Sequence, residues 1–168
     1  ICAVFLGTGS FFLWSGTGIA MEDAAIHLAM AKGLFSEGFF SLTSGVPAGA
    51  VTSPLWIVLE AIPLALFGSI TAATTFMTLL AAGCLMGTLW LLFSQDSPWI
   101  AGMMIGFCFL AGPIQWHLWS GMETMLFNSC CLCVLGAMRK WNERAARHWL
   151  FAAILTRMEA ILFLPAVG

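Results

Sequence analysis

Charged residues are scarce in this chain. Only 8% of its 168 residues are Asp, Glu, Lys or Arg, whereas a soluble domain carries about 25%. The six Lys and Arg residues and the net charge of −2 provide no basic surface for a nucleic-acid backbone, so we expect no nucleic-acid partner. With 61% hydrophobic residues and a mean hydropathy of +0.97, the composition predicts a membrane protein.

Several signatures of soluble enzymes are also missing. The sequence shows no Gly-rich phosphate loop, no set of Ser, His and Asp, no internal repeat and no low-complexity tract. The cysteines lie inside apolar runs with no His at metal-ligand spacing, so we predict no metal ligands and interpret them as core or lipid-facing residues. Residues 1–20 lack the basic start and the cleavage site of a signal peptide, and we expect a spanning helix there.

Apolar segments recur along the whole chain. A bilayer core about 30 Å thick needs roughly 20 apolar residues in a helix. Two shorter segments, 53–68 and 98–112, are bounded by Pro or Gly and would form tilted, re-entrant or interfacial helices. The sequence therefore predicts an all-α fold, a polytopic transmembrane bundle of about five to six segments in a single domain over residues 1–168. The four segments of full length are 1–20, 70–93, 123–138 with its flanks, and 149–166.

A basic segment and a polar loop orient this bundle. The basic segment, 139–147, belongs in the cytoplasm by the positive-inside rule. The polar loop, 21–52, is predicted to be an outer loop with an amphipathic helix in its first half and turn residues in its second. If every segment crosses, this loop and segment 116–124 lie on opposite sides. If one short segment fails to cross, both lie outside, and we favour this arrangement because of the resemblance given below.

Glu22 and Asp23 are adjacent carboxylates just after the first apolar segment. Water at a membrane boundary keeps a carboxylate ionised, while the low dielectric nearby raises its pKa, which suits a general base. The simpler interpretation is that the pair only marks the end of a span. His27 lies four residues after Asp23 and shares its helix face, but two side chains are too few for a metal site.

Ionisable residues also occur inside the apolar segments. Glu60 stands in such a run, where an exposed charge costs roughly 2.5–3.5 kcal/mol, so it should face a partner or a cavity. Arg157 and Glu159 raise the same question. Either Arg157 forms a structural ion pair with Glu60 or Glu159, or these residues bind an anionic headgroup. Glu123 is the acid nearest to His117 in a segment rich in Trp.

Four short motifs follow one another along the chain: EDAAIHLAMAKGL, GAVTSPLW, SGMETMLF and LTRMEA. In this order and spacing they resemble the GT-C membrane glycosyltransferases, in particular the bacterial branch related to terminal arabinofuranosyltransferases. The resemblance covers roughly residues 20–160 and only the N-terminal part of a usual family member. We therefore expect this chain to be the N-terminal part of a GT-C module.

The resemblance implies a multi-pass transferase in the bacterial cytoplasmic membrane, with its active site on the periplasmic face. It would take a sugar from a polyprenyl-phosphate donor and pass it to a hydroxyl of a glycan, lipid or protein, and the need for a divalent metal stays open. In the family, an acid of the first outer loop is the general base, a role that falls here on Asp23 or Glu22. The implied substrate-binding residues are His27, Lys32, Thr52, His117, Glu123 and Arg157.

The sequence departs from the family pattern at two positions. Ala29 and Gly33 stand where the family often has Arg and Asn, so Lys32 or Arg157 would have to supply the missing contact. Two other functions stay open: a transporter or channel subunit that uses Glu60, Arg157 and Glu159, and a non-catalytic membrane scaffold.

Overall fold

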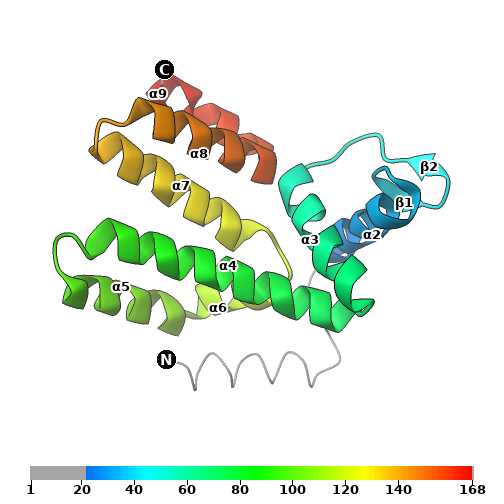
Figure 1. Cartoon of the computed structure of the whole chain (residues 1–168), viewed down its shortest axis with the longest axis horizontal. Coiled ribbons are helices and arrows are strands. Elements are labelled where there is room, and N and C mark those ends of the chain that lie inside the picture. The colour runs from blue at the N-terminus through cyan, green and yellow to red at the C-terminus, as the bar shows by residue number, and fades with distance from the viewer. Residues whose placement is uncertain (1–21, 168) are drawn as a thin grey trace.

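The computed structural model describes residues 22–167, and almost all of the ordered elements in this range are helices (Figure 1). The all-α prediction is confirmed. The span predicted at 1–20 lies outside the described residues. The elements are α2 (Glu22–Glu37), β1 (Ser41–Thr43), β2 (Val46–Pro47), α3 (Pro54–Phe67), α4 (Ile70–Phe93), α5 (Pro98–Leu110), α6 (Gly112–Trp119), α7 (Thr124–Arg139), α8 (Glu143–Thr156), the 3-10 helix η1 (Met158–Phe163) and α9 (Leu164–Val167).

Local sequence explains where several helices begin and end. Gly68 ends α3 in the left-handed conformation (φ 62°), which a residue without a side chain adopts readily. The side chain of Ser69 then caps α4 by accepting a hydrogen bond from the backbone N–H of Ala72. Asn142 caps α8 in the same way, accepting from the N–H of Ala145 at 3.0 Å. Side-chain caps therefore start two helices that follow tight turns.

Fewer helices than expected are long enough to cross a membrane. Among residues 22–167, α4 alone has the length and hydropathy of a span, and α5 with α6, bent by 71°, makes a second if the pair is one broken span. The prediction of about five to six full-length spans is corrected to one or two in this range. Helix α7 has only 16 residues, and α8 ends after 14 because Arg157 adopts an extended conformation, so the segment predicted at 149–166 is divided among α8, η1 and α9.

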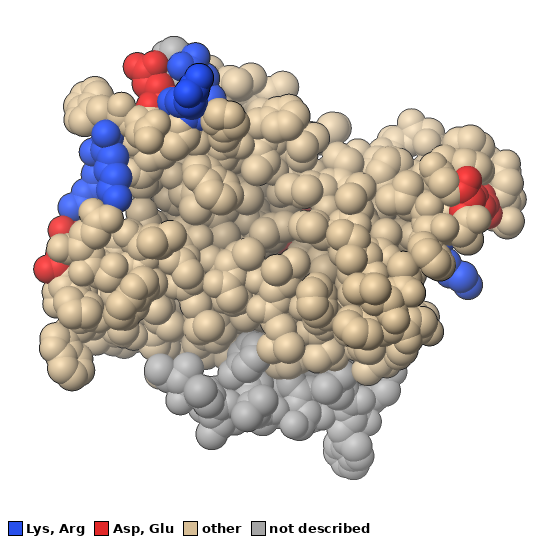
Figure 2. All heavy atoms as spheres, in the orientation of Figure 1, with Lys and Arg blue, Asp and Glu red and all other residues tan. Residues whose placement is uncertain are grey.

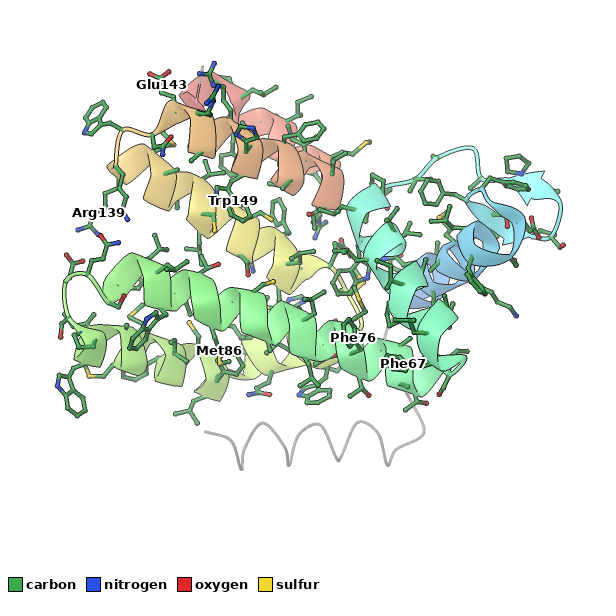
Figure 3. The ribbon with its side chains drawn as sticks, in the orientation of Figure 1. Phe67, Phe76, Met86, Arg139, Glu143 and Trp149 are labelled. Atoms are coloured by element: carbon green, nitrogen blue, oxygen red, sulfur yellow. The ribbon has the colours of Figure 1, made fainter. Side chains whose placement is uncertain are left out.

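Helices α4, α5, α7 and α8 lie side by side with similar axis directions (Figure 1). Helices α2 and α3 and the β1–β2 hairpin gather near one end of this layer, and α3 runs across the direction of α4. Phe67 at the end of α3 contacts Phe76 near the start of α4, with ring centroids 6.1 Å apart (Figure 3). The α2–α3 unit is therefore attached to the N-terminal end of α4.

Hydroxyl side chains join α4 to its neighbours. Thr78 is buried and donates a hydrogen bond to the carbonyl of Leu118 in α6 at 3.0 Å. Thr88 contacts the Sγ of Cys133 in α7 at 3.6 Å. Such short polar side chains let helices approach closely and hydrogen-bond across their interface.

The outer surface of the helical layer is largely apolar. Large hydrophobic side chains stand exposed on several helices, among them Leu66, Phe107 and Leu162. Figure 2 shows charged side chains at the two ends of the visible face and a broad uncharged band between them. A surface of this kind exceeds the scattered apolar exposure of ordinary soluble proteins.

The second half of the polar loop, predicted as turns, contains the short antiparallel hairpin of β1 and β2. Glu37 at the end of α2 accepts a hydrogen bond from the N–H of Gly45 in the hairpin turn, at 3.0 Å. A Cβ at Gly33 would lie 2.2 Å from the Oγ of Ser41 in β1. Because Gly33 has no side chain, α2 can pack closely against the hairpin.

Candidate functional site

A cavity of about 300 Å³ lies where four separate parts of the chain meet. Its volume falls at the lower end of small-molecule sites, which occupy roughly 300–1,000 Å³. The walls come from the first turns of α2, the segment before α3, the α6–α7 turn and the junction of α8 with η1. They are formed by Asp23, Ile26, His27, Met30, Ala50, Thr52, Ser53, Met122, Glu123, Arg157 and Glu159.

Helix α2 contributes two polar side chains, one turn apart. Asp23 is exposed, so water reaches its carboxylate, whereas His27 is only 4% exposed. Their spacing of four residues places both on the face that lines the cavity. The side chain of the neighbouring acid, Glu22, lies outside the described part of the structure. Asp23 is thus the acid of the pair whose position at a cavity is established.

Glu123 links the histidine of α2 to the arginine that follows α8. Its side chain is almost completely buried, with Oε2 3.5 Å from Nδ1 of His27 and Oε1 3.7 Å from Nε of Arg157. The geometry between His27 and Glu123 does not make a hydrogen bond, and both facing atoms are buried without one. The two residues lie far apart in the sequence, so no spacing signal pointed to their contact.

The turn between α6 and α7 determines the position of Glu123. Gly121 has a φ of +78°, a left-handed conformation that other residues adopt with strain. A Cβ at Gly121 would lie only 3.2 Å from the Cβ of Ala24 in the first turn of α2. Gly121 therefore permits both the turn and its close approach to α2, two residues before Glu123.

Arg157 leaves α8 in an extended conformation and enters the cavity wall. Its Nη2 donates a hydrogen bond to Oε1 of Glu159 at 3.0 Å, and its guanidinium lies 5.9 Å from the ring centre of Phe127. The hydrogen bond to Glu159 is the main reason why the pKa of Arg157 is raised. Of the two ion pairs that the sequence left open for Arg157, the structure shows the one with Glu159, and its second acidic partner is Glu123.

Burial determines the protonation of His27. Desolvation lowers its pKa, and this outweighs the opposite effects of the nearby Glu123 and Asp23, while Arg157 lowers the pKa further. The imidazole is therefore neutral at neutral pH. In this state His27 presents one donor and one acceptor nitrogen to its surroundings, and its contact with Glu123 is polar but not an ion pair.

Glu60 is buried in the middle of α3. Its side chain is 1% exposed, and its Oε2 has no hydrogen-bond partner. It lies close enough to Glu123 for the two carboxyl groups to interact electrostatically. A buried carboxylate without a hydrogen bond is costly, so this environment favours the neutral acid. Glu60 is not among the residues that line the cavity.

The other predicted binding residues divide into two groups. Thr52 lines the cavity, and its neighbour Ser53, which the sequence did not single out, does so as well. Lys32 is exposed farther along α2, and His117 is half-buried on α6, and neither is among the residues that line this cavity. Of the two cations considered for a phosphate contact, Arg157 is therefore the one in the cavity wall.

Within residues 22–167, no group of three or more His, Cys, Asp or Glu side chains is arranged to hold a metal ion. Cys130 and Cys133 have C-x-x-C spacing on α7, but both are free thiols in an apolar helix. The described residues that line the cavity thus offer a polar surface with one arginine rather than a metal centre.

No known protein family, curated protein or solved structure matches this chain. The site is therefore interpreted from its geometry and from the four motifs in the sequence.

Proposed function

We propose that this protein is a membrane glycosyltransferase that moves a sugar from a polyprenyl-phosphate donor to a hydroxyl acceptor at the outer face of the bacterial cytoplasmic membrane. One observation carries the proposal: the four motifs that resemble the GT-C enzymes, separated along the chain, meet at one cavity. Each motif supplies at least one wall residue, namely Asp23, Thr52, Glu123 and Arg157.

The surface supports a membrane setting. Only 39% of the most apolar stretch of α4 is buried inside the protein, and apolar side chains cover the outside of the helical layer. The charged ends seen in Figure 2 fit the two water-facing sides of a bilayer. We propose that α4 and the bent α5–α6 pair cross together with the span predicted at 1–20, and that α7 and α8, too short for full-length spans, pack beside them.

This topology agrees with the position of the cavity. Helix α3 remains on the outer side, so the polar loop and the α6–α7 turn share that side, where both line the cavity. The basic residues at the end of α7 then face the cytoplasm. These contacts support the arrangement in which one short segment fails to cross.

In the proposed reaction, Asp23 acts as the general base. Its exposed carboxylate accepts the proton of the acceptor hydroxyl while the oxygen forms a bond to the anomeric carbon of the donor sugar. The bond between that carbon and the phosphate oxygen breaks, and polyprenyl phosphate leaves with the electron pair. Arg157, a permanent cation in the cavity wall, is placed to stabilise the departing phosphate.

The charge of the cavity sets a condition on donor binding. Asp23, Glu123 and Glu159 face the single positive charge of Arg157 among the described residues of the wall. Glu123 is buried, whereas the side chain of Glu159 is 65% exposed and free to move into water. A donor phosphate would therefore replace Glu159 as a partner of the Arg157 guanidinium, while Glu123 keeps its contact with Arg157.

The test is sugar transfer by the full chain in liposomes, with a panel of radiolabelled polyprenyl-phosphate hexoses and pentoses. Asp23→Asn should reduce transfer by about 10²–10⁴-fold, the usual contribution of a general base, while donor retention and membrane insertion stay intact. Glu143→Gln, which removes an exposed acid far from the cavity, is the matched control. Equal activity of Asp23→Asn and the unaltered chain would remove Asp23 from the mechanism. Flux of a solute or proton that depends on Glu60 would favour a transporter instead.

A further inference from the structure

A second pocket, of about 140 Å³, lies between the C-terminal ends of α4 and α7. Helix α7 connects the two sites: Glu123, just before its start, lines the cavity, and Arg139 at its end lines this pocket. At 1.5 Å per residue, the helix separates them by about 24 Å. In the proposed topology this second pocket faces the cytoplasm.

Polar and apolar walls meet in this pocket. Gln95, Asp96, Arg139 and Lys140 form the polar side, and Asp96 pairs with Arg139 at 3.3 Å. Leu91 lines the apolar side of the pocket, and most of its side chain is exposed. A site for a free anion would not need this apolar wall, whereas a lipid brings a charged headgroup and an acyl chain together.

Positive charge is in excess around the pocket. Four of the six Lys and Arg residues of the chain lie between positions 139 and 147. In the described structure, Asp96 compensates Arg139 and Glu143 compensates Arg147, at 3.6 Å. The charges of Lys140 and Arg144, both exposed, remain as the excess. Of these two cations, Lys140 lines the pocket and Arg144 lies in the first turn of α8, just after the α7–α8 turn.

Trp141 is an independent sign of an interface. It adopts a φ of +53° in the turn between α7 and α8, a position where helices usually carry Gly, and its side chain is 93% exposed. The strained backbone is held by hydrogen bonds from the N–H of Trp141 to Met138 and from the N–H of Asn142 to Ala137. Strain that presents a fully exposed indole points to a function for that indole, and Trp favours the headgroup layer of a membrane.

We propose that this end of the protein binds the headgroup phosphate of an anionic phospholipid of the inner leaflet. Lys140 and Arg144 provide the cationic contacts, Leu91 packs against the acyl chain, and Trp141 lies in the headgroup layer. Trp99 is 83% exposed at the start of α5 and adds a second indole. The Asp96–Arg139 pair joins the loop before α5 to α7. The proposal depends on the proposed membrane topology and not on sugar transfer.

The experiment uses the full chain in nanodiscs that contain equal amounts of phosphatidylcholine and phosphatidylglycerol, with brominated chains on only one of the two lipids. Fluorescence quenching of Trp141 is obtained as the difference between the unaltered chain and Trp141→Phe. We expect brominated phosphatidylglycerol to quench Trp141 several-fold more than brominated phosphatidylcholine. The double variant Lys140→Gln with Arg144→Gln should abolish this preference, whereas Lys32→Gln, a cation on the opposite side, should keep it.

Three outcomes would overturn the proposal. The first is equal quenching by the two lipids in the unaltered chain, and the second is a preference that survives in the double variant. The third is a preference that inorganic phosphate removes while chloride at the same ionic strength does not, because this would identify a site for free phosphate. Since no sugar transfer is measured, these outcomes are separate from a failure of the proposed enzymatic activity.

Discussion

Oε2 of Glu123 lies 3.5 Å from Nδ1 of His27, and both side chains are buried. Glu123 also contacts Arg157, so a single carboxylate holds together the α2, α6–α7 and α8–η1 parts of the cavity. A buried acid between two partners is a structural requirement of the site whether or not it touches the substrate.

We expect Glu123→Ala to lower the free energy of unfolding by about 1–3 kcal/mol, because it removes the carboxylate beside Arg157 and opens a gap in the buried wall. Glu143→Ala removes an exposed acid that pairs with Arg147 at i,i+4, and it should change stability by less than about 0.5 kcal/mol. Denaturation of both variants in detergent, followed by near-UV circular dichroism, measures the difference. Equal effects would mean that the Glu123 contacts are not structural.

The pH dependence of stability follows from His27. Because burial lowers its pKa, the folded state prefers the neutral imidazole and the unfolded state takes up the proton first. This contribution to stability is complete above the ordinary pKa of His, about 6.5, and is lost as the pH falls below it. We expect the midpoint temperature of the unaltered chain to fall between neutral and mildly acidic pH.

His27→Gln should flatten this pH dependence, and His148→Gln, which replaces an exposed histidine of α8, should retain it. Thermal scans at matched ionic strength over this pH range make the comparison. A slope that is the same in His27→Gln as in the unaltered chain would show that other groups cause it.

Gly121 provides a test of how the site is positioned. Gly121→Ala adds a Cβ at φ +78° and 3.2 Å from Ala24, so we expect a loss of about 1–2 kcal/mol of stability. Gly49→Ala is the matched control, since its Cβ would meet no atom within 4 Å. If Gly121→Ala were as stable as the control, the tight approach of the α6–α7 turn to α2 would be incorrect.

Glu159 competes with the donor phosphate for Arg157 in the proposed reaction. Hydrogen bonds from its own backbone N–H and from Arg157 lower the pKa of Glu159, so it stays ionised at neutral pH. We expect Glu159→Gln to lower the KM for the polyprenyl-phosphate donor several-fold with little change in kcat. The reason is that a neutral amide competes less strongly than a carboxylate with the donor phosphate for Arg157. Steady-state kinetics with Glu143→Gln as control measure this, and a raised KM would mean that Glu159 itself binds the donor.

Several features of the fold could be predicted from sequence because they depend on local chemistry. The apolar composition and the turn residues indicated an all-helical chain, and Gly68 and Ser69 mark a helix boundary that the structure confirms. The number of spans could not be obtained in this way. Hydropathy counts apolar residues, but it does not show that α8 ends at Thr156, within the apolar segment 149–166.

Some residues of the cavity could be named from the sequence, but their arrangement could not. The i,i+4 spacing of Asp23 and His27 places them on one helix face, and the structure keeps them together at the cavity. The contact of Glu123 with His27 depends on how the α6–α7 turn packs on α2, which is tertiary information. His117 lies close to Glu123 in sequence, yet it projects from α6 and does not line the cavity.

The wall of the cavity is completed only by Arg157 and Glu159, although its first residue is Asp23. During synthesis, the early wall segments therefore leave the ribosome before the segment that carries Arg157 and Glu159. Until then, Glu123 lacks its contact with Arg157. Loss of the segment after α8 would thus remove Arg157 and Glu159 from a cavity whose wall begins at Asp23.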